Sequence, residues 1–193
     1  MQRSGWVPFA AVVCGLALHV AYAQQQLVPS GQASDFANGS ASALTYCPAK
    51  TNSCGTVPTI LGNGAPSATA PVGFIVRCIN ARASSLGNLK QGVLIYSVTG
   101  TMNAPFAGGT LCIAPPIRRT ITRPPAAPGT LGNCDAIHGI DMNAFTQGTI
   151  AGQGSPDPAL KQIGTQVWCQ WIARDTKASG QLLSNALTYM QGP

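Results

Sequence analysis

The sequence GVLIYSV at residues 92–98 opens the stretch that decides the fold. Its alternation places every second side chain on one face of a predicted β-strand. After this strand we expect a turn at residues 102–106, a further β segment over residues 108–120, and a proline-rich excursion that ends at Cys134. Residues 92–134 are therefore typical of folded β structure with loops, and they contain no pattern of a reaction centre.

Strands are also predicted outside this stretch. Alternating side chains indicate strands at residues 73–80, 138–144 and 166–174, and a final strand is expected at residues 182–190. A strand at residues 56–61 contains a proline, which fits the edge of a sheet better than its centre. The side chains expected on shared faces are Phe74, Val76 and Cys78, then His138, Ile140 and Met142, then Val167, Cys169, Trp171 and Ala173.

Helical periodicity is not sustained in any segment, and a single helical turn is expected after Pro158. Short strands and turn signals recur at close intervals, and glycine and proline are abundant. This pattern is typical of an all-β protein that forms an antiparallel β-sandwich or a jelly-roll-like fold, rich in loops and stapled by disulfides.

The N-terminus of the chain predicts export. A positive start, an apolar run over residues 7–20 and small residues at its end predict a signal peptide at residues 1–23, cleaved near Ala23. The apolar run is too short for a transmembrane helix. Residues 24–42 are polar and predict a flexible segment, and residues 43–193 predict a single β-sandwich domain. We therefore expect a secreted, cell-surface or periplasmic protein without stable membrane insertion.

The charge balance limits the classes of partner. Eleven lysine and arginine residues stand against five acidic residues, and the net charge is +6 at pH 7. Apart from Arg118, Arg119 and Arg123 the basic residues are dispersed, and no nucleic-acid-binding motif is present, so nucleic acid is not expected as a partner. The charge supports a weak attraction to anionic surfaces such as extracellular polysaccharide. Other surface proteins are the alternative partners, and the sequence sets no oligomeric state.

Cysteines that follow the predicted signal peptide number six: Cys47, Cys54, Cys78, Cys112, Cys134 and Cys169. An even number in an exported chain predicts disulfides rather than metal or thiol chemistry, although spacing alone leaves every pairing open. Turn-forming residues between Cys47 and Cys54 favour a small disulfide-closed loop. Cys112 and Cys134 flank the proline-rich excursion, and a bridge between them would stabilise the fold by about 3 kcal/mol in the chain-entropy model.

A set of short phrases resembles a module of large secreted bacterial proteins, where it often lies at the C-terminus and has no established activity. These phrases are YC at 46–47 with NS at 52–53, GAPSA at 64–68, GVLIY at 92–96, PFAGGTLC at 105–112, PPIRRT at 115–120, IDMNAF at 140–145, and QW at 170–171 with RD at 174–175. The resemblance covers residues 46–193. It implies a compact exported module and supplies no catalytic residues.

The resemblance also implies a disulfide scheme. Cysteines like Cys47, Cys54, Cys112 and Cys134 recur in that module, whereas other small residues usually take the places of Cys78 and Cys169. The two additional cysteines lie at core-facing strand positions, so they are expected to pair with each other. The scheme is therefore Cys47 with Cys54, Cys112 with Cys134, and Cys78 with Cys169.

Catalytic chemistry is not predicted. Alternation places His138 and Asp141 on opposite faces of one strand, so they cannot form the oriented pair of a Ser-His-Asp centre. Paired carboxylates for glycoside hydrolysis are scarce, because the chain has no glutamate. We expect Asp141 and Asp175 to cap turns or to pair with the double arginine at 118–119 or with Arg174. No spacing of acidic residues indicates a calcium site, and no cofactor is expected.

Trp168 is the main candidate for a ligand contact. It falls on the face of its strand opposite Cys169, with Gln170 and Arg174, and aromatic rings among amides are able to stack on sugars. The sequence thus predicts an exported, non-enzymatic structural, adhesive or binding module whose ligand it does not identify. A carbohydrate-binding domain is the alternative, and a hydrolase acting on an extracellular polymer is the second alternative. The candidate ligand surface comprises Trp168, Gln170, Arg174, Arg118, Arg119 and Asp141.

Overall fold

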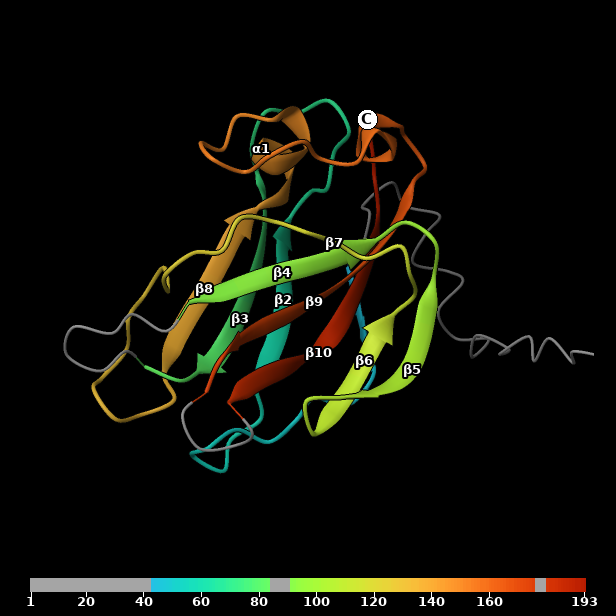
Figure 1. The fold of residues 1–193 in the computed structure, drawn as a ribbon. Coiled ribbons are helices and arrows are strands. Elements are labelled where there is room, and N and C mark those ends of the chain that lie inside the picture. The colour runs from blue at the N-terminus through green and yellow to red at the C-terminus, as the bar shows by residue number, and fades with distance from the viewer. Residues whose placement is uncertain (1–42, 84–90, 176–179) are drawn as a thin grey trace, which may run out of the picture. The chain divides into compact units, whose positions relative to one another are not determined.

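Two antiparallel sheets and a hairpin make up the computed structural model, which describes residues 43–83, 91–175 and 180–193. Sheet A has the strand order β1-β10-β9-β4-β7, sheet B has the order β2-β3-β8, and β5 pairs with β6 (Figure 1). All these strand pairs are antiparallel, which confirms the predicted all-β sandwich. The strands are β1 (Leu44–Tyr46), β2 (Thr59–Gly64), β3 (Phe74–Ala81), β4 (Gly92–Ser97), β5 (Thr101–Phe106), β6 (Gly109–Ile113), β7 (Arg118–Arg119), β8 (Ala136–Asp141), β9 (Gln166–Arg174) and β10 (Gln181–Met190).

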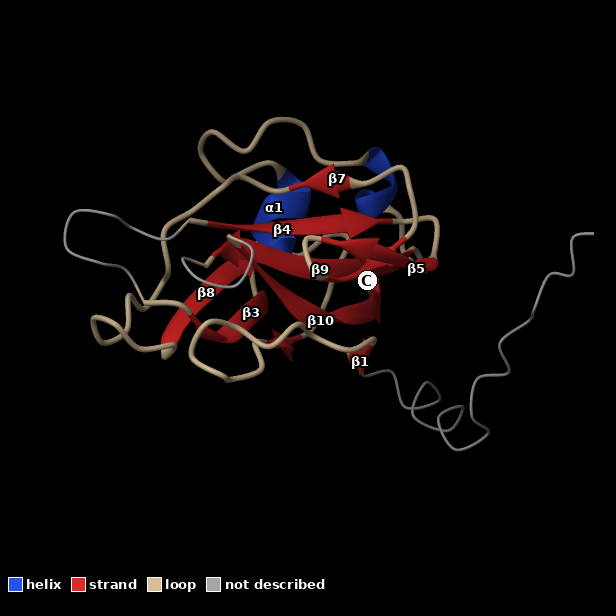
Figure 2. Ribbon diagram, turned by 60° about the horizontal axis from the view of Figure 1, so that its bottom comes forward, coloured by secondary structure: helices blue, strands red, loops and turns tan. Residues whose placement is uncertain are grey.

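Helices take up little of the described chain, as Figure 2 shows: α1 spans Met142–Gln147, and the 3-10 helix η2 spans Pro158–Lys161. The second of these confirms the helical turn expected after Pro158. The predicted signal peptide (1–23) and flexible segment (24–42) lie outside the described residues.

The end of β8 differs from the prediction. The strand ends at Asp141, whose carboxylate caps α1 by accepting hydrogen bonds from the backbone N–H groups of Asn143 (3.0 Å) and Ala144 (3.1 Å). Gly148 ends the helix with a left-handed φ of 80°. The strand predicted over residues 138–144 is therefore wrong after Asp141.

The core lies between the facing sides of sheets A and B. The ring of His138 in sheet B stacks on Trp171 in sheet A, with centroids 5.6 Å apart, and Phe74 meets Tyr189 edge-on at 4.7 Å. In Figure 1, β4 crosses β2 and β3 at a steep angle. Alternation correctly predicted the buried side chains of three strands: Phe74, Val76, Cys78, His138, Ile140, Val167, Cys169, Trp171 and Ala173.

The β5–β6 hairpin covers the outer face of sheet A. The turn predicted at residues 102–106 is wrong, because these residues belong to β5 and the chain turns at Ala107 and Gly108, which have φ values of 47° and 75°. Beneath the hairpin, Gln170 is fully buried. Its side chain accepts a hydrogen bond from the Cys112 N–H (3.2 Å) and donates to the carbonyls of Thr110 (3.0 Å) and Ser184 (2.8 Å). One amide side chain thus joins the hairpin to two strands of the sheet.

Residues 120–127, here called the bridging segment, connect the two sheets. The backbones of Arg123 and Gly92 in β4 exchange two hydrogen bonds of 2.9 Å. Farther along, the backbones of Ala127 and Ile137 in β8 exchange two of 3.1 and 2.9 Å. The prolines within the segment restrict its backbone further. The proline-rich excursion is therefore held at two points: Arg123 pairs with sheet A, and Ala127, four residues later, pairs with sheet B.

The disulfides overturn the predicted scheme. Cys47 pairs with Cys112 and Cys54 pairs with Cys134, so neither the local loop nor the bridge across the excursion forms. Cys78 and Cys169 are free, buried thiols. Burial raises the pKa of Cys78 to about 12, which keeps that thiol protonated at neutral pH.

The physical reason for this pairing is the path of residues 47–54. The Lys50 N–H donates to the Leu183 carbonyl of β10 (3.0 Å), and the Lys50 ammonium donates to the Ala107 carbonyl at the hairpin turn (2.7 Å). The segment therefore lies against the hairpin instead of closing on itself. Its first cysteine meets β6, and its last meets the loop before β8. Both bridges consequently close long loops.

Candidate functional site

The four aspartates in the described residues all accept hydrogen bonds from the backbone. Asp141 caps the turn that follows it, as expected, and Asp157 caps η2 in the same way, whereas Asp175 accepts from a residue far away in the sequence. Hydrogen bonding by Thr130 also lowers the pKa of Asp135 below its usual value. The donors are the N–H groups of Thr130 to Asp135 (2.8 Å), Asn143 and Ala144 to Asp141 (3.0 and 3.1 Å), Ala159 to Asp157 (3.0 Å) and Ser53 to Asp175 (2.7 Å).

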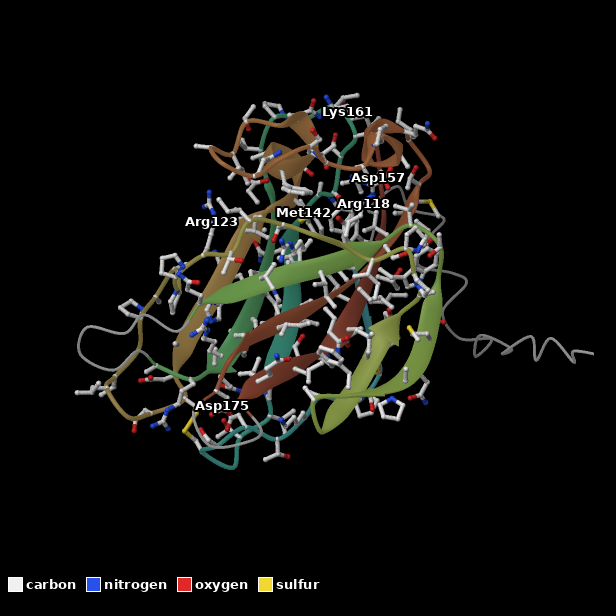
Figure 3. All side chains as sticks on the ribbon, viewed as in Figure 1. Arg118, Arg123, Met142, Asp157, Lys161 and Asp175 are labelled. Carbon is white, nitrogen blue, oxygen red and sulfur yellow. A yellow bond between two sulfur atoms is a disulfide. The ribbon has the colours of Figure 1, made fainter. Side chains whose placement is uncertain are left out.

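Arg118 forms an ion pair with Asp157, a partner that the sequence analysis did not predict. Its Nε lies 2.7 Å from Oδ2 of Asp157, which also caps η2. Figure 3 shows these two side chains together near η2, whereas Asp175 lies at the opposite end of the sandwich. The expectation that Asp141 or Asp175 pairs with the double arginine is therefore wrong for Arg118.

The candidate ligand surface predicted from sequence does not form one patch. Gln170 is not on the surface at all, because the hairpin covers it. Arg119 lies opposite Ile95 in the register of sheet A, and Trp168 lies opposite Ser97, so both occupy the outer face of that sheet. Asp141 instead lies on sheet B, at the start of α1. Arg174 is exposed at the end of β9.

His138 is a core residue. It is 1% exposed, neither ring nitrogen has a hydrogen-bond partner, and it packs so closely on Gly92 that a Cβ there would lie 2.7 Å from Nδ1. Burial lowers its pKa to about 4, so the ring is neutral at pH 7. His138 faces the core and Asp141 does not, which confirms that the two cannot form a catalytic pair.

A cleft lies on the outer face of sheet B, beneath the bridging segment. Its volume is about 260 Å³. Gly139 lies opposite Arg77 in the register of β3 and β8, and a Cβ at Gly139 would have nothing closer than the Arg77 Cγ at 3.6 Å. The absence of a side chain at Gly139 therefore lets the stem of Arg77 and the methyl group of Ala126 lie close to the strand. The residues that line the cleft are Ile75, Arg77, Arg123, Ala126, Ile137, Gly139, Ile140 and Asp141.

Positive charge dominates this cleft. Within the described chain, neither Arg77 nor Arg123 forms an ion pair or a side-chain hydrogen bond, and the two come from different elements. Asp141 is the acidic residue nearby, but its Oδ1 caps α1 and its Oδ2 accepts from the Gly73 N–H at 2.8 Å. Two guanidinium groups therefore remain available beside an apolar floor.

Sequence reasoning missed the residues of this cleft. Alternation over residues 73–80 puts Arg77 on the face opposite Phe74, Val76 and Cys78, and a glycine inside a strand often marks a place where another group approaches closely. Those two signals were present at Arg77 and Gly139. Nothing in the sequence indicated that the bridging segment would bring Arg123 above them.

Among the described residues, no three His, Cys, Asp or Glu side chains gather as a metal site. No helix in residues 43–83, 91–175 and 180–193 has the length and apolar character needed to cross a bilayer.

No protein-family model, curated protein or solved structure matches the chain.

Proposed function

We propose that this chain is an exported, non-catalytic binding module that attaches to anionic material outside the cell. The main support is a difference between the acidic and the basic side chains. In the described residues every aspartate is bound to backbone N–H groups, whereas Arg77, Arg119, Arg123 and Arg174 have no acidic partner. The carboxylates are thus held by the protein's own N–H groups, although Asp135 is exposed, whereas these four guanidinium groups are available to attract anionic surfaces.

Support for a non-catalytic role comes from the state of the titratable groups. Among the described residues, the one histidine, His138, is buried and neutral, and the carboxylates accept backbone hydrogen bonds, which leaves few groups for general acid–base chemistry there. Support for export comes from the two disulfides, which are typical of proteins that fold in oxidising compartments.

Co-sedimentation with insoluble polysaccharides tests this function. The purified chain is expected to sediment with an acidic polymer such as polygalacturonate and not with cellulose, and added salt is expected to release it. Equal sedimentation with both polymers, or with neither, would contradict the proposal.

Incubation of the purified chain with ester and glycoside substrates tests the non-catalytic part of the proposal, and no turnover is expected. Turnover that His138→Ala abolishes would contradict the non-catalytic assignment.

A second candidate function is recognition of neutral carbohydrate through Trp168. This ring is partly exposed on the outer face of sheet A, where its neighbours across the strands are Ser97 and Thr188. A glycan array with the wild-type chain and Trp168→Ala separates the two functions. Binding of a neutral glycan that Trp168→Ala abolishes would favour this candidate.

A further inference from the structure

The residues of the cleft beneath the bridging segment indicate which class of anion the module binds. We infer that it binds one carboxylate-bearing sugar unit, a hexuronate of an acidic polysaccharide, and that Arg77 and Arg123 hold the carboxylate. This inference rests on the proposed function and adds to it a site and a ligand class.

The two arginines supply the donors. A guanidinium group is planar and presents parallel N–H bonds that match the two oxygens of a carboxylate. Arg77 extends from the outer face of β3, and Arg123 comes from the bridging segment, whose backbone is paired with Gly92. Figure 3 shows Arg123 apart from the ion pair of Arg118 and Asp157, so its charge is not neutralised there. Since both arginines border one cleft, a single anion is able to contact both.

The size and walls of the cleft favour a sugar ring. Its volume of about 260 Å³ lies just below the range of about 300–1,000 Å³ that is usual for drug-sized ligands. Ile75, Ile137 and Ala126 give it apolar walls, and Gly139 adds no side chain to its floor. One pyranose ring offers C–H faces for these walls and carries its carboxylate on one side.

Asp141 selects against more highly charged anions. A carboxylate has about four acceptor positions. Three of those of Asp141 are taken by the N–H groups of Gly73, Asn143 and Ala144. One remains for a hydroxyl donor of the ligand. Its negative charge repels a dianion more than a monoanion. A singly charged ligand with hydroxyl groups fits this site better than phosphate does.

Isothermal titration of the whole chain with a galacturonate trisaccharide tests the site. Arg77→Ala and Arg123→Ala are each expected to weaken binding roughly tenfold or more, because each removes a charge-assisted hydrogen bond. Gly139→Val is expected to weaken it similarly by filling the floor. Arg119→Ala is the matched control: it removes the same charge from the outer face of sheet A, and binding is expected to change less than about twofold. Thermal unfolding checks that each variant is folded.

The outcomes separate this inference from the proposed function. If Arg119→Ala weakens binding as much as Arg77→Ala and Arg123→Ala do, general charge attraction explains binding and the assigned site is wrong, although the proposed function stands. If inorganic phosphate or a neutral glucose trisaccharide binds as well as the galacturonate, the ligand class is wrong. If the wild-type chain binds neither the trisaccharide nor an acidic polymer, both proposals are wrong.

Discussion

The polar side chains on the outer faces of the two sheets differ in whether other segments of the chain form hydrogen bonds with them. On sheet A the hairpin covers Gln170, and both ends of its amide are bonded to backbone groups. On sheet B the bridging segment stands above Arg77 and Gly139 and leaves a cleft. Gln170 and Arg77 both lie on strand faces turned away from the inter-sheet core.

This difference teaches that facing away from the core does not make a residue part of a binding surface. What matters is whether another segment of the chain satisfies the polar group. Where the hairpin does so, the residue contributes stability. Where no described segment does so, as at Arg77, the polar group is available to a ligand.

Removal of the disulfide that holds the hairpin is expected to have the largest effect. Cys47 and Cys112 lie 65 residues apart, and the chain-entropy model gives a bridge of this length about 4 kcal/mol of stability. The double substitution Cys47→Ala/Cys112→Ala is therefore expected to lower the free energy of unfolding by about that amount in urea titrations. Non-reduced peptide mapping identifies the bridge directly. A peptide that joins Cys47 to Cys54 would contradict the account.

Loss of the Gln170 amide is expected to come next. Gln170→Ala leaves three backbone groups without their partner beneath the hairpin, and the expected loss is about 3 kcal/mol in the free energy of unfolding. Arg77→Ala on the other sheet is the comparison variant, and it is expected to change that free energy by less than about 0.5 kcal/mol. Similar losses in the two variants would remove the distinction between the faces.

Acid is expected to act through His138 rather than through the cleft. The unfolded chain binds a proton at this residue below about pH 6.5, whereas the folded chain does so only below about pH 4. The free energy of unfolding therefore falls as the pH drops from about 6.5 to 4, by at most about 3 kcal/mol. His138→Phe, which keeps a ring beside Trp171, is expected to flatten this part of the profile in urea titrations at several pH values.

His138 lies in the inter-sheet core and does not line the cleft. Ligand affinity of the folded wild-type chain should therefore stay nearly constant between pH 6.5 and 5. A steep loss of affinity while the chain stays folded would show that a titrating group takes part in binding.

Alternation predicted the inter-sheet core well because burial of one strand face leaves a period-two pattern in the sequence. Trp171 and Cys78 could be placed in this way. The hairpin was missed because β5 contains Asn103 and Pro105, which are more typical of turns. The disulfides were missed because their pairing depends on where residues 47–54 run in three dimensions.

The cleft was missed for the same reason. Its two arginines lie far apart in the sequence, and only the path of the bridging segment brings Arg123 over β3 and β8. Gly139 carried a local signal, but no pattern joined it to Arg123. Sites formed by long-range packing of a loop on a sheet leave little trace in local periodicity.

A nitrogen–proton NMR titration with the galacturonate trisaccharide tests the central claim most directly, because it observes both outer faces at once. We expect the largest shift changes at the backbone amides of residues 75–77 and 137–141, of Arg123 and of Ala126, and no change at the indole N–H of Trp168. The largest changes at Trp168 and Arg119, with the amides of the cleft unmoved, would contradict the account.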